Sequence, residues 1–140
     1  VILDPAPVEG VEPLLECDAV DYVVPNENEY GALEAQLEPF DGVIVRTRGD
    51  GDVLVDGERC FTVTPPAVEP VDTTGAGDVL NGFLGARLAA GDSLPDAVET
   101  STIAASLSTR HEGARSGVPT LEEIRRFRAS GELPTQRLSQ

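Results

Sequence analysis

The sequence predicts an α/β layered fold with a mostly parallel sheet flanked by helices. Short β-branched runs, such as the one that contains Val20, Val23 and Val24, alternate with segments whose apolar residues recur at helical spacing. This alternation is typical of parallel strands, because a parallel connection needs a crossover, which is usually a helix. A glycine-bearing loop also leads directly into an apolar helix after residue 75. Open α/β sheets bind ligands at such strand-to-helix junctions.

The first half of the chain predicts strands at residues 1–3, 20–24 and 42–45, because each is a short apolar run that turn residues bound. A short helix is expected at residues 11–16. A longer helix is expected at residues 26–38, where Tyr30, Leu33 and Leu37 share one face. Residues 52–55 and 59–63 predict a hairpin around Asp56 and Gly57.

The second half predicts three helices. The first carries an apolar stripe and ends near Gly91; the stripe consists of Val79, Leu80, Phe83, Leu84 and Leu88. The second begins with Ser93 as its N-cap and Pro95 in its first turn, and it runs to Leu107. The third covers residues 120–128, with Thr120 and Glu123 as a capping box. Residues 1–128 are expected to form the domain, and residues 129–140 a tail that frays.

The composition describes an acidic, folded protein. The net charge is -15, and all ten basic residues are arginines. Such a surface repels nucleic acids and anionic membranes, so neither is expected as a partner. No apolar run is long enough to span a membrane and no signal peptide is evident, so a cytoplasmic location is expected. The acidic residues are spread along the chain, which fits a halophilic, salt-adapted surface; an acidic mesophilic protein is the alternative.

The cysteines indicate a reducing compartment. Cys17 and Cys60 are far apart in the sequence, and the chain has one histidine, which makes a zinc site unlikely on ligand count. We expect both cysteines to be buried or half-buried small apolar residues. The chain opens on Val1 and enters a strand at once, which leads us to expect a piece of a longer protein.

The loop at residues 71–78 carries the functional signal. Gly75 and Gly77 remove side chains where a loop becomes a helix, and the first N–H groups of a helix lack intrahelical partners. Together with the helix dipole, these groups favour an anion such as phosphate. Asp78 places a carboxylate at the rim, where it would serve as a base for a nearby hydroxyl. A capped glycine turn without a ligand is the alternative, because short glycine motifs have many false positives.

Four segments resemble one family. The string D-T-T-G-A-G-D at residues 72–78, followed by an apolar helix, resembles the C-terminal signature of the ribokinase family, the phosphofructokinase-B type of carbohydrate kinase. Residues 3–7 are similar to its N-P-A-P, residues 25–29 to its P-N-x-x-E, and residues 113–119 to its G-A-x-x-S-x-P. The resemblance implies a ribokinase-like layered fold, of which this chain would be the C-terminal, nucleotide-binding half.

The resemblance also implies ligands and their residues. The catalytic residues would be Asp78, Gly75, Ala76 and Gly77. Asp78 would act as the base and contact the sugar, and the amides of the other three would form the anion hole. Gly77 and Asp78 would also contact ATP. Asn26 and Glu29 would organise Mg²⁺ and phosphate, although a capping box alone explains this pair. Thr102 would touch the nucleobase. A loop along the nucleotide, or a plain glycine turn, would consist of Arg46, Thr47, Arg48, Gly49, Asp50 and Gly51.

A potassium ion is a further expectation that rests on the resemblance. In ribokinase, backbone carbonyls and part of the D-T-T string hold this ion beside the anion hole. The corresponding positions are Asp72, Thr74, Ser108, His111, Gly113 and Gly117. The chain departs from the pattern by one extra residue before Gly113 and by glycine at position 117, and His111 is expected to take part through its backbone.

The expected function is therefore ATP-dependent phosphorylation of a sugar hydroxyl. No lysine exists to form a P-loop, so positive charge must come from backbone dipoles, cations or arginine. A nucleotide-binding regulatory module without turnover is one alternative. A family kinase for fructose, fructose phosphate, a keto-deoxy sugar acid or a nucleoside is the other. The N-terminal half of the family supplies the sugar pocket and the lid, which could form a homodimer, so residues 1–140 alone are expected to be inactive.

Overall fold

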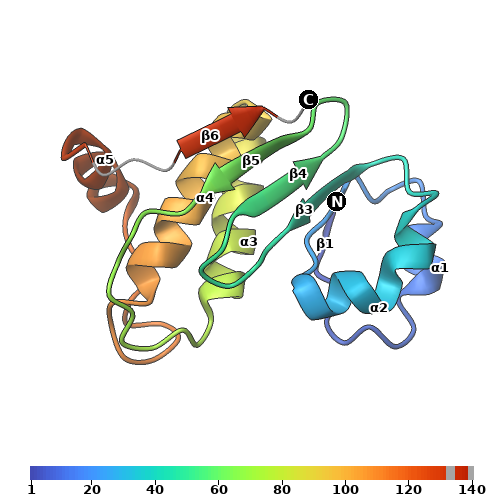
Figure 1. Ribbon diagram of the computed structural model, residues 1–140, viewed down its shortest axis with the longest axis horizontal. Coiled ribbons are helices and arrows are strands. Elements are labelled where there is room, and N and C mark those ends of the chain that lie inside the picture. Colours follow the sequence, from blue (N-terminus) through green and yellow to red (C-terminus); the bar gives the residue numbers. More distant parts are fainter. Residues whose placement is uncertain (132–134, 139–140) are drawn as a thin grey trace. The chain divides into compact units, whose positions relative to one another are not determined.

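The computed structural model describes residues 1–131 and, for the backbone, residues 135–138. The chain divides into two compact units: residues 1–62 together with the segment from residue 136, and residues 63–135 (Figure 1). The six strands of the described residues lie in one sheet in the order in which they follow one another along the chain. No helix in the described part of the chain combines the length and the apolar character needed to cross a membrane.

The first unit begins with three short parallel strands joined by helices. β1 (Ile2–Leu3) pairs with β2 (Tyr22–Val23), which pairs with β3 (Val43–Arg46). Between them lie α1 (Glu12–Leu15) and α2 (Glu27–Leu37). Their boundaries agree with the predicted strands and helices within two residues, because β-branched runs and helical spacing coincide here with the residues that the fold buries.

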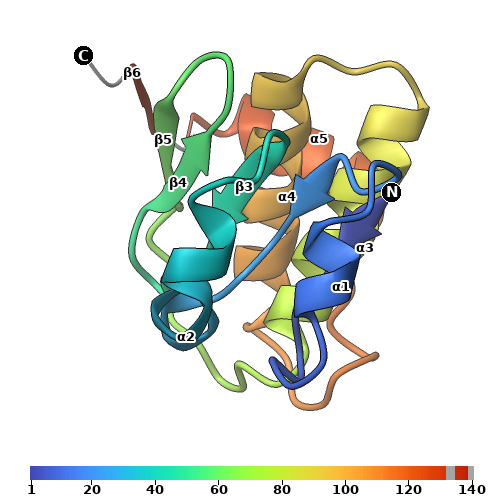
Figure 2. The ribbon, with the colours of Figure 1, turned by 90° about the vertical axis from the view of Figure 1, so that its right-hand side faces the viewer.

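The hairpin begins after β3. β4 (Val53–Asp56) runs antiparallel to β3, and β5 (Phe61–Thr64) lies beside β4 (Figure 2). In β4 and β5 buried residues alternate with half-buried or exposed ones, as expected for strands with one face on a core. The sheet is therefore mixed: it is parallel through β3 and turns antiparallel at the predicted hairpin.

The core of the first unit lies between its helices and strands. Leu33 and Leu37 of α2 are 2% and 3% exposed and pack with Val23 and Ile44 of the strands. The predicted face of α2 is thus the buried one, with Tyr30 partly buried at its edge. The helix begins at the capping box of Asn26, which satisfies the N–H groups of Asn26 and Glu29.

The second unit is built on two packed helices. α3 (Ala76–Ala89) and α4 (Leu94–Ser108) lie side by side (Figure 1), and α5 (Leu121–Ala129) packs against α4. The predicted stripe of α3 is buried at Val79, Leu80 and Leu84. An ion pair of 2.8 Å between Arg128 and Glu99 also connects α5 with α4.

Two predictions differ from the structure. The expectation that Cys17 and Cys60 are buried or half-buried is wrong, because both are exposed. Cys17 follows α1 in a turn, and Cys60 lies in the hairpin connection, where its Sγ is 3.1 Å from Oδ1 of Asp56. In the segment expected to be a fraying tail, the backbone forms β6 (Thr135–Leu138); the remaining residues of that prediction, 132–134 and 139–140, lie outside the described residues.

Candidate functional site

The glycine loop of the second unit turns sharply into α3 at Gly75. Gly75 is the N-cap residue and has φ +79°, in the left-handed region that favours glycine. A Cβ atom at this position would also lie 3.0 Å from the Cβ atom of Ala114. The turn therefore requires glycine for two reasons, its backbone conformation and its close contact with the loop that follows α4.

The amides beyond this turn are partly free. A Cβ atom at Gly77 would meet no atom within 4 Å, so the space beside this residue is open. The N–H groups of Gly75 and Gly77 have no hydrogen-bond partner among the described residues, as expected at a helix start. The Ala76 N–H differs from the prediction, because it donates to the Thr73 carbonyl at 3.2 Å. The tight turn at Gly75 brings the Ala76 N–H close to the Thr73 carbonyl.

Asp78 lies in the first turn of α3 and is exposed. Its carboxylate forms no hydrogen bond or ion pair with any residue that the structure describes. A negative charge is favourable at this end of a helix because of the helix dipole. The carboxylate is therefore accessible and uncommitted, which is what a general base requires.

Asp72 connects the glycine loop with the loop after α4. Its Oδ1 accepts from the Thr74 N–H and its Oδ2 accepts from the Gly113 N–H, both at 2.9 Å. The Thr74 side chain donates to the same carboxylate, and together with these two N–H groups it lowers the Asp72 pKa to about 2. The Val71 and Asp72 N–H groups donate to the Thr109 carbonyl at 2.6 and 3.0 Å. Asp72 is thus charged at neutral pH and holds the two loops in one arrangement.

The other predicted cation ligands are also close to one another. A Cβ atom at Gly117 would lie 2.4 Å from the Ser108 carbonyl oxygen and 3.1 Å from the His111 Cβ. Glycine at position 117 therefore allows the chain to approach the end of α4. No group of three or more histidine, cysteine, aspartate or glutamate side chains that could hold a metal exists in the described part of the chain. A cation here would depend on Asp72 and on carbonyl oxygens.

Thr102 does not fit its predicted role. Its side chain is 2% exposed, and its hydroxyl donates to the Val98 carbonyl of the same helix at 2.7 Å. Ser101 makes the equivalent bond to Ala97 at 2.6 Å. Both hydroxyls are satisfied inside α4, so Thr102 has neither the exposure nor a free donor for a nucleobase.

In the first unit, Asn26 and Glu29 form the capping box of α2. Oδ1 of Asn26 accepts from the Glu29 N–H at 2.8 Å, and Oε2 of Glu29 accepts from the Asn26 N–H at 2.7 Å. The box uses one oxygen of each side chain and leaves Oε1 of Glu29 available. Asn26 also forms a parallel bridge with Thr47, whose N–H donates to the Pro25 carbonyl at 2.9 Å.

This bridge places the predicted nucleotide loop beside the start of α2. The loop turns at Gly49, which has φ +62°, and closes with a bond from the Gly51 N–H to the Arg48 carbonyl at 2.9 Å. Asp50 is exposed within this turn. The sequence did not indicate that Glu27 lies within 4 Å of both Arg46 and Arg48, because neither spacing nor periodicity relates α2 to the end of β3.

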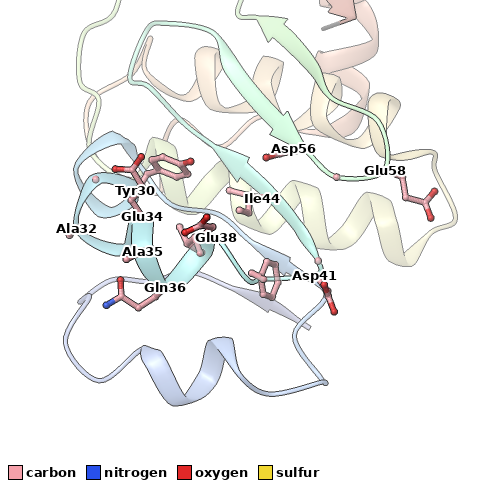
Figure 3. Close-up of a pocket in the computed structure, with 15 residues that line it drawn as sticks. Tyr30, Ala32, Glu34, Ala35, Gln36, Glu38, Asp41, Ile44, Asp56 and Glu58 are labelled. Atoms are coloured by element: carbon pink, nitrogen blue, oxygen red, sulfur yellow. The ribbon is translucent and has the colours of Figure 1, made fainter. Parts of the chain in front are cut away.

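A large hollow in the first unit is not suited to a nucleotide. It has a volume of about 1210 Å³ and lies between α2, the start of β3 and the hairpin turn (Figure 3). Its charged lining side chains are all acidic, and they are Glu34, Glu38, Asp41, Asp56 and Glu58. Because these carboxylates would repel phosphate, the anion-binding features remain those of the glycine loop and the start of α2.

Comparison with known families decides the identity. Residues 1–121 match the model of the pfkB family carbohydrate kinases. The chain belongs to this family. It is 34% identical over 132 residues to a ribokinase of Lactococcus lactis, covering 89% of this chain and 44% of the relative. It is also 36% identical over 146 residues to a 1-phosphofructokinase of Haloferax volcanii, covering 91% and 47%.

Solved structures of ribokinases and of a fructokinase confirm the predicted ribokinase-like fold. The chain matches a ribokinase from Thermotoga maritima with a TM-score of 0.84 and 34% identity, over 92% of this chain and 48% of that one. It matches a putative ribokinase II from E. coli in complex with ATP and Mg²⁺ with a TM-score of 0.79 and 26% identity, over 90% and 44%. A Vibrio cholerae fructokinase variant bound to fructose, ADP and potassium gives 0.77 and 25%, over 91% and 49%.

The chain spans about half the length of these relatives. The four segments that first indicated the family include the glycine loop and residues 113–119, which the structure brings together through Asp72 and Gly113. The contact between Ala114 and Gly75 was not foreseen. Its only signal in the sequence was the occurrence of both residues in motifs of one family.

Proposed function

We propose that this protein is a sugar kinase that transfers the terminal phosphoryl group of ATP to a sugar hydroxyl. The observation that carries the proposal is the start of α3, where the open amides of Gly75 and Gly77 lie next to the exposed, uncommitted carboxylate of Asp78. An anion site alone would not need a carboxylate at its rim, because the two negative charges repel each other. A base beside a phosphate site explains both features.

In this proposal Asp78 accepts the proton of the acceptor hydroxyl, and the hydroxyl oxygen then attacks the terminal phosphorus atom of ATP while ADP leaves. The N–H groups of Gly75 and Gly77 donate to the oxygens of the phosphoryl group in transfer. The Ala76 N–H contributes only if it exchanges its 3.2 Å bond to the Thr73 carbonyl, a distance at the upper end of the usual range for a backbone hydrogen bond. Two free amides and the helix dipole are sufficient for an anion site.

ATP and Mg²⁺ are the proposed partners of this site, and the E. coli relative solved with both supports them. Asn26 and Glu29 fit a role toward magnesium, because the capping box leaves Oε1 of Glu29 available to hold a water of the ion's hydration shell. The ion, when bound, neutralises charge on the phosphate oxygens. Thr47, Gly49 and Gly51 would line the nucleotide through their backbone.

A monovalent cation at the loops after α3 and α4 is part of the same proposal. The donors that fit it are the Asp72 carboxylate and the carbonyl oxygens of residues 74, 108, 111, 113 and 117. Asp72 is charged and already joins both loops, and Gly117 lies against the Ser108 carbonyl. The fructokinase variant of Vibrio cholerae contains potassium, which supports the choice of ion. The ion would stabilise the loop that ends at Gly75.

Ribose is the first acceptor to test, because ribokinases are among the relatives with the highest identity. Fructose or a fructose phosphate is a second candidate acceptor. The observation that favours it is the identity of the chain to a 1-phosphofructokinase, 36%, and to a fructokinase, 29%. Asp78 and the glycine loop would act in the same way on fructose or fructose 1-phosphate. Measurement of ADP formation with a panel of these sugars distinguishes the acceptors.

Asp78→Asn tests the proposed base, with turnover measured in a chain that also carries the N-terminal half of the family, since residues 1–140 alone are expected to be inactive. Turnover should fall about 10²- to 10⁴-fold, as for loss of a general base, while ATP affinity stays within a few-fold. Asp96→Asn is the matched control, because Asp96 is also an exposed acid in the first turn of a helix and makes no proposed contact. Equal turnover in the two variants would rule out the base and leave a nucleotide-binding regulatory module as the better proposal.

A further inference from the structure

The second unit contains a hollow of its own, which we call the α4–α5 pocket. It has a volume of about 610 Å³ and lies among the end of α4, the loop that follows α4, and α5. All the residues that line it lie between Leu107 and Ser130, so it belongs to one compact unit. Its size is within the range of small-molecule sites, and its lining contains neither Asp78 nor any residue of the glycine loop.

Apolar side chains form part of the lining. Leu107 and Pro119 are buried, and Phe127 is partly buried where it packs against the core cluster of α3, α4 and α5. Val118 also lines the pocket, and at 46% exposure it is one of four exposed large apolar side chains in the described residues. Burial of apolar surface is favourable by about 25 cal/mol per Å². A ligand with an apolar part would cover Val118 and gain this stabilisation.

The charged side chains of the pocket favour an anion. Arg110 and Arg126 line it, and its one acid, Glu123, is engaged in the capping box of α5, where Oε2 accepts from the Thr120 N–H at 2.6 Å. The Arg110 guanidinium forms no hydrogen bond or ion pair with any residue that the structure describes. Arg126 pairs with Glu122 at 2.8 Å, but these side chains are 74% and 71% exposed, so water weakens the pair. Two guanidinium groups are thus available to a ligand.

The segment that forms the pocket departs from the acidic character of the protein. Residues 110–128 contain five arginines and three glutamates, whereas the rest of the chain contains five arginines and 22 acidic residues. Despite this excess of acids, Arg110, Arg115 and Arg125 have no ion-pair partner among the described residues. An acidic protein therefore keeps uncompensated positive charge in this segment, which attracts anions to it.

We propose that the α4–α5 pocket binds a small organic anion, a carboxylate or a phosphate monoester that carries an apolar part. The anionic group pairs with Arg110 and Arg126, because a guanidinium donates two parallel hydrogen bonds to either kind of group. The apolar part contacts Val118 and Phe127. The one carboxylate of the lining already caps α5, so binding and no reaction is assigned to this site. The inference goes beyond the proposed function and does not depend on it.

Isothermal titration calorimetry of the full chain with benzoate and with phenyl phosphate tests the inference and distinguishes the two kinds of anion. One molecule of the preferred anion should bind per chain. Acetate and inorganic phosphate lack the apolar part, and phenol lacks the charge, so each of them should bind about tenfold more weakly or not at all.

Two substitutions at exposed residues locate the site. Arg110→Gln should weaken binding of the preferred anion about tenfold, because it removes a charge-assisted hydrogen bond. Val118→Ser should weaken it several-fold, because it removes apolar contact area. Arg125→Gln is the matched control and should change nothing, since Arg125 is also exposed and without an ion-pair partner among the described residues, but lies outside the lining.

Several results would overturn the inference. Absence of one-to-one binding by both benzoate and phenyl phosphate would exclude an anion site of this kind. Equal losses in Arg110→Gln and Arg125→Gln would indicate a general effect of charge. Full affinity in Val118→Ser, or equal affinity for benzoate and acetate, would contradict recognition of an apolar part. If Arg110→Gln does not fold, Val118→Ser and the smaller probes still decide. Absence of phosphoryl transfer would be a separate result, because none of these measurements involves it.

Discussion

Substitutions at Gly75 and Gly77, at the start of α3, allow an effect on stability to be separated from an effect on function. Gly75→Ala places a side chain at φ +79° and 3.0 Å from the Ala114 Cβ atom. Gly77→Ala places one in open space within the first turn of α3. The two substitutions add the same methyl group two residues apart, so each is the control for the other.

The expected magnitudes follow from these two environments. A left-handed backbone costs a residue with a Cβ atom about 1–2 kcal/mol, and the contact with Ala114 adds to this cost. We expect Gly75→Ala to lower the free energy of unfolding by roughly 2–3 kcal/mol in total, and Tm by roughly 3 °C per kcal/mol. Gly77→Ala should be neutral or stabilising by up to about 1 kcal/mol, because alanine favours a helix over glycine. Its methyl group would instead occupy the side from which a phosphate approaches the amides.

Thermal unfolding of both variants, and phosphoryl transfer measured with the N-terminal half of the family also present, test this reasoning. Gly77→Ala should retain Tm but lose about 10²-fold or more in kcat/KM, the size of effect seen when an oxyanion donor is removed. Gly75→Ala should instead show the lower Tm worked out above. Full activity in Gly77→Ala would refute an anion at these amides, and an unchanged Tm in Gly75→Ala would refute the conformational argument.

Two further predictions concern pH and salt. The Thr120 N–H donates to Glu123 at 2.6 Å and lowers the Glu123 pKa from its usual 4.5. Since a lowered pKa stabilises the fold only while the group is ionised, the Tm difference between the protein and Glu123→Gln should be constant above about pH 5 and shrink as the pH falls below 4.5. A gap as large at pH 3 as at pH 7 would contradict this. Glu122→Gln, which removes the exposed partner of Arg126, is the control and should leave Tm nearly unchanged. The net charge of -15 predicts that Tm rises steeply from low salt to about 1 M KCl, where the Debye length is about 3 Å; a salt-independent Tm would favour a mesophilic origin for the acidic surface.

Most secondary structure followed from neighbouring residues. The capping boxes at Asn26 and Thr120 mark helix starts in the sequence and form in the structure, with the first helical residue at Glu27 and Leu121. The hairpin after β3 and the apolar stripe of α3 were predicted in the same way. These features depend on contacts within about four residues or on one repeating period, so the sequence displays their cause directly.

The sequence by itself determined the family, the α/β alternation, the glycine loop with its carboxylate, and the excess of negative charge. Only the tertiary structure decided which residues meet across long separations: Asp72 with Gly113, Gly75 with Ala114, and Arg46 with Tyr30. It also decided that Thr102 is buried and that both cysteines are exposed. The physical reason is that burial and long-range contact depend on how separate elements pack, and a local pattern carries no information about the neighbour that will cover it.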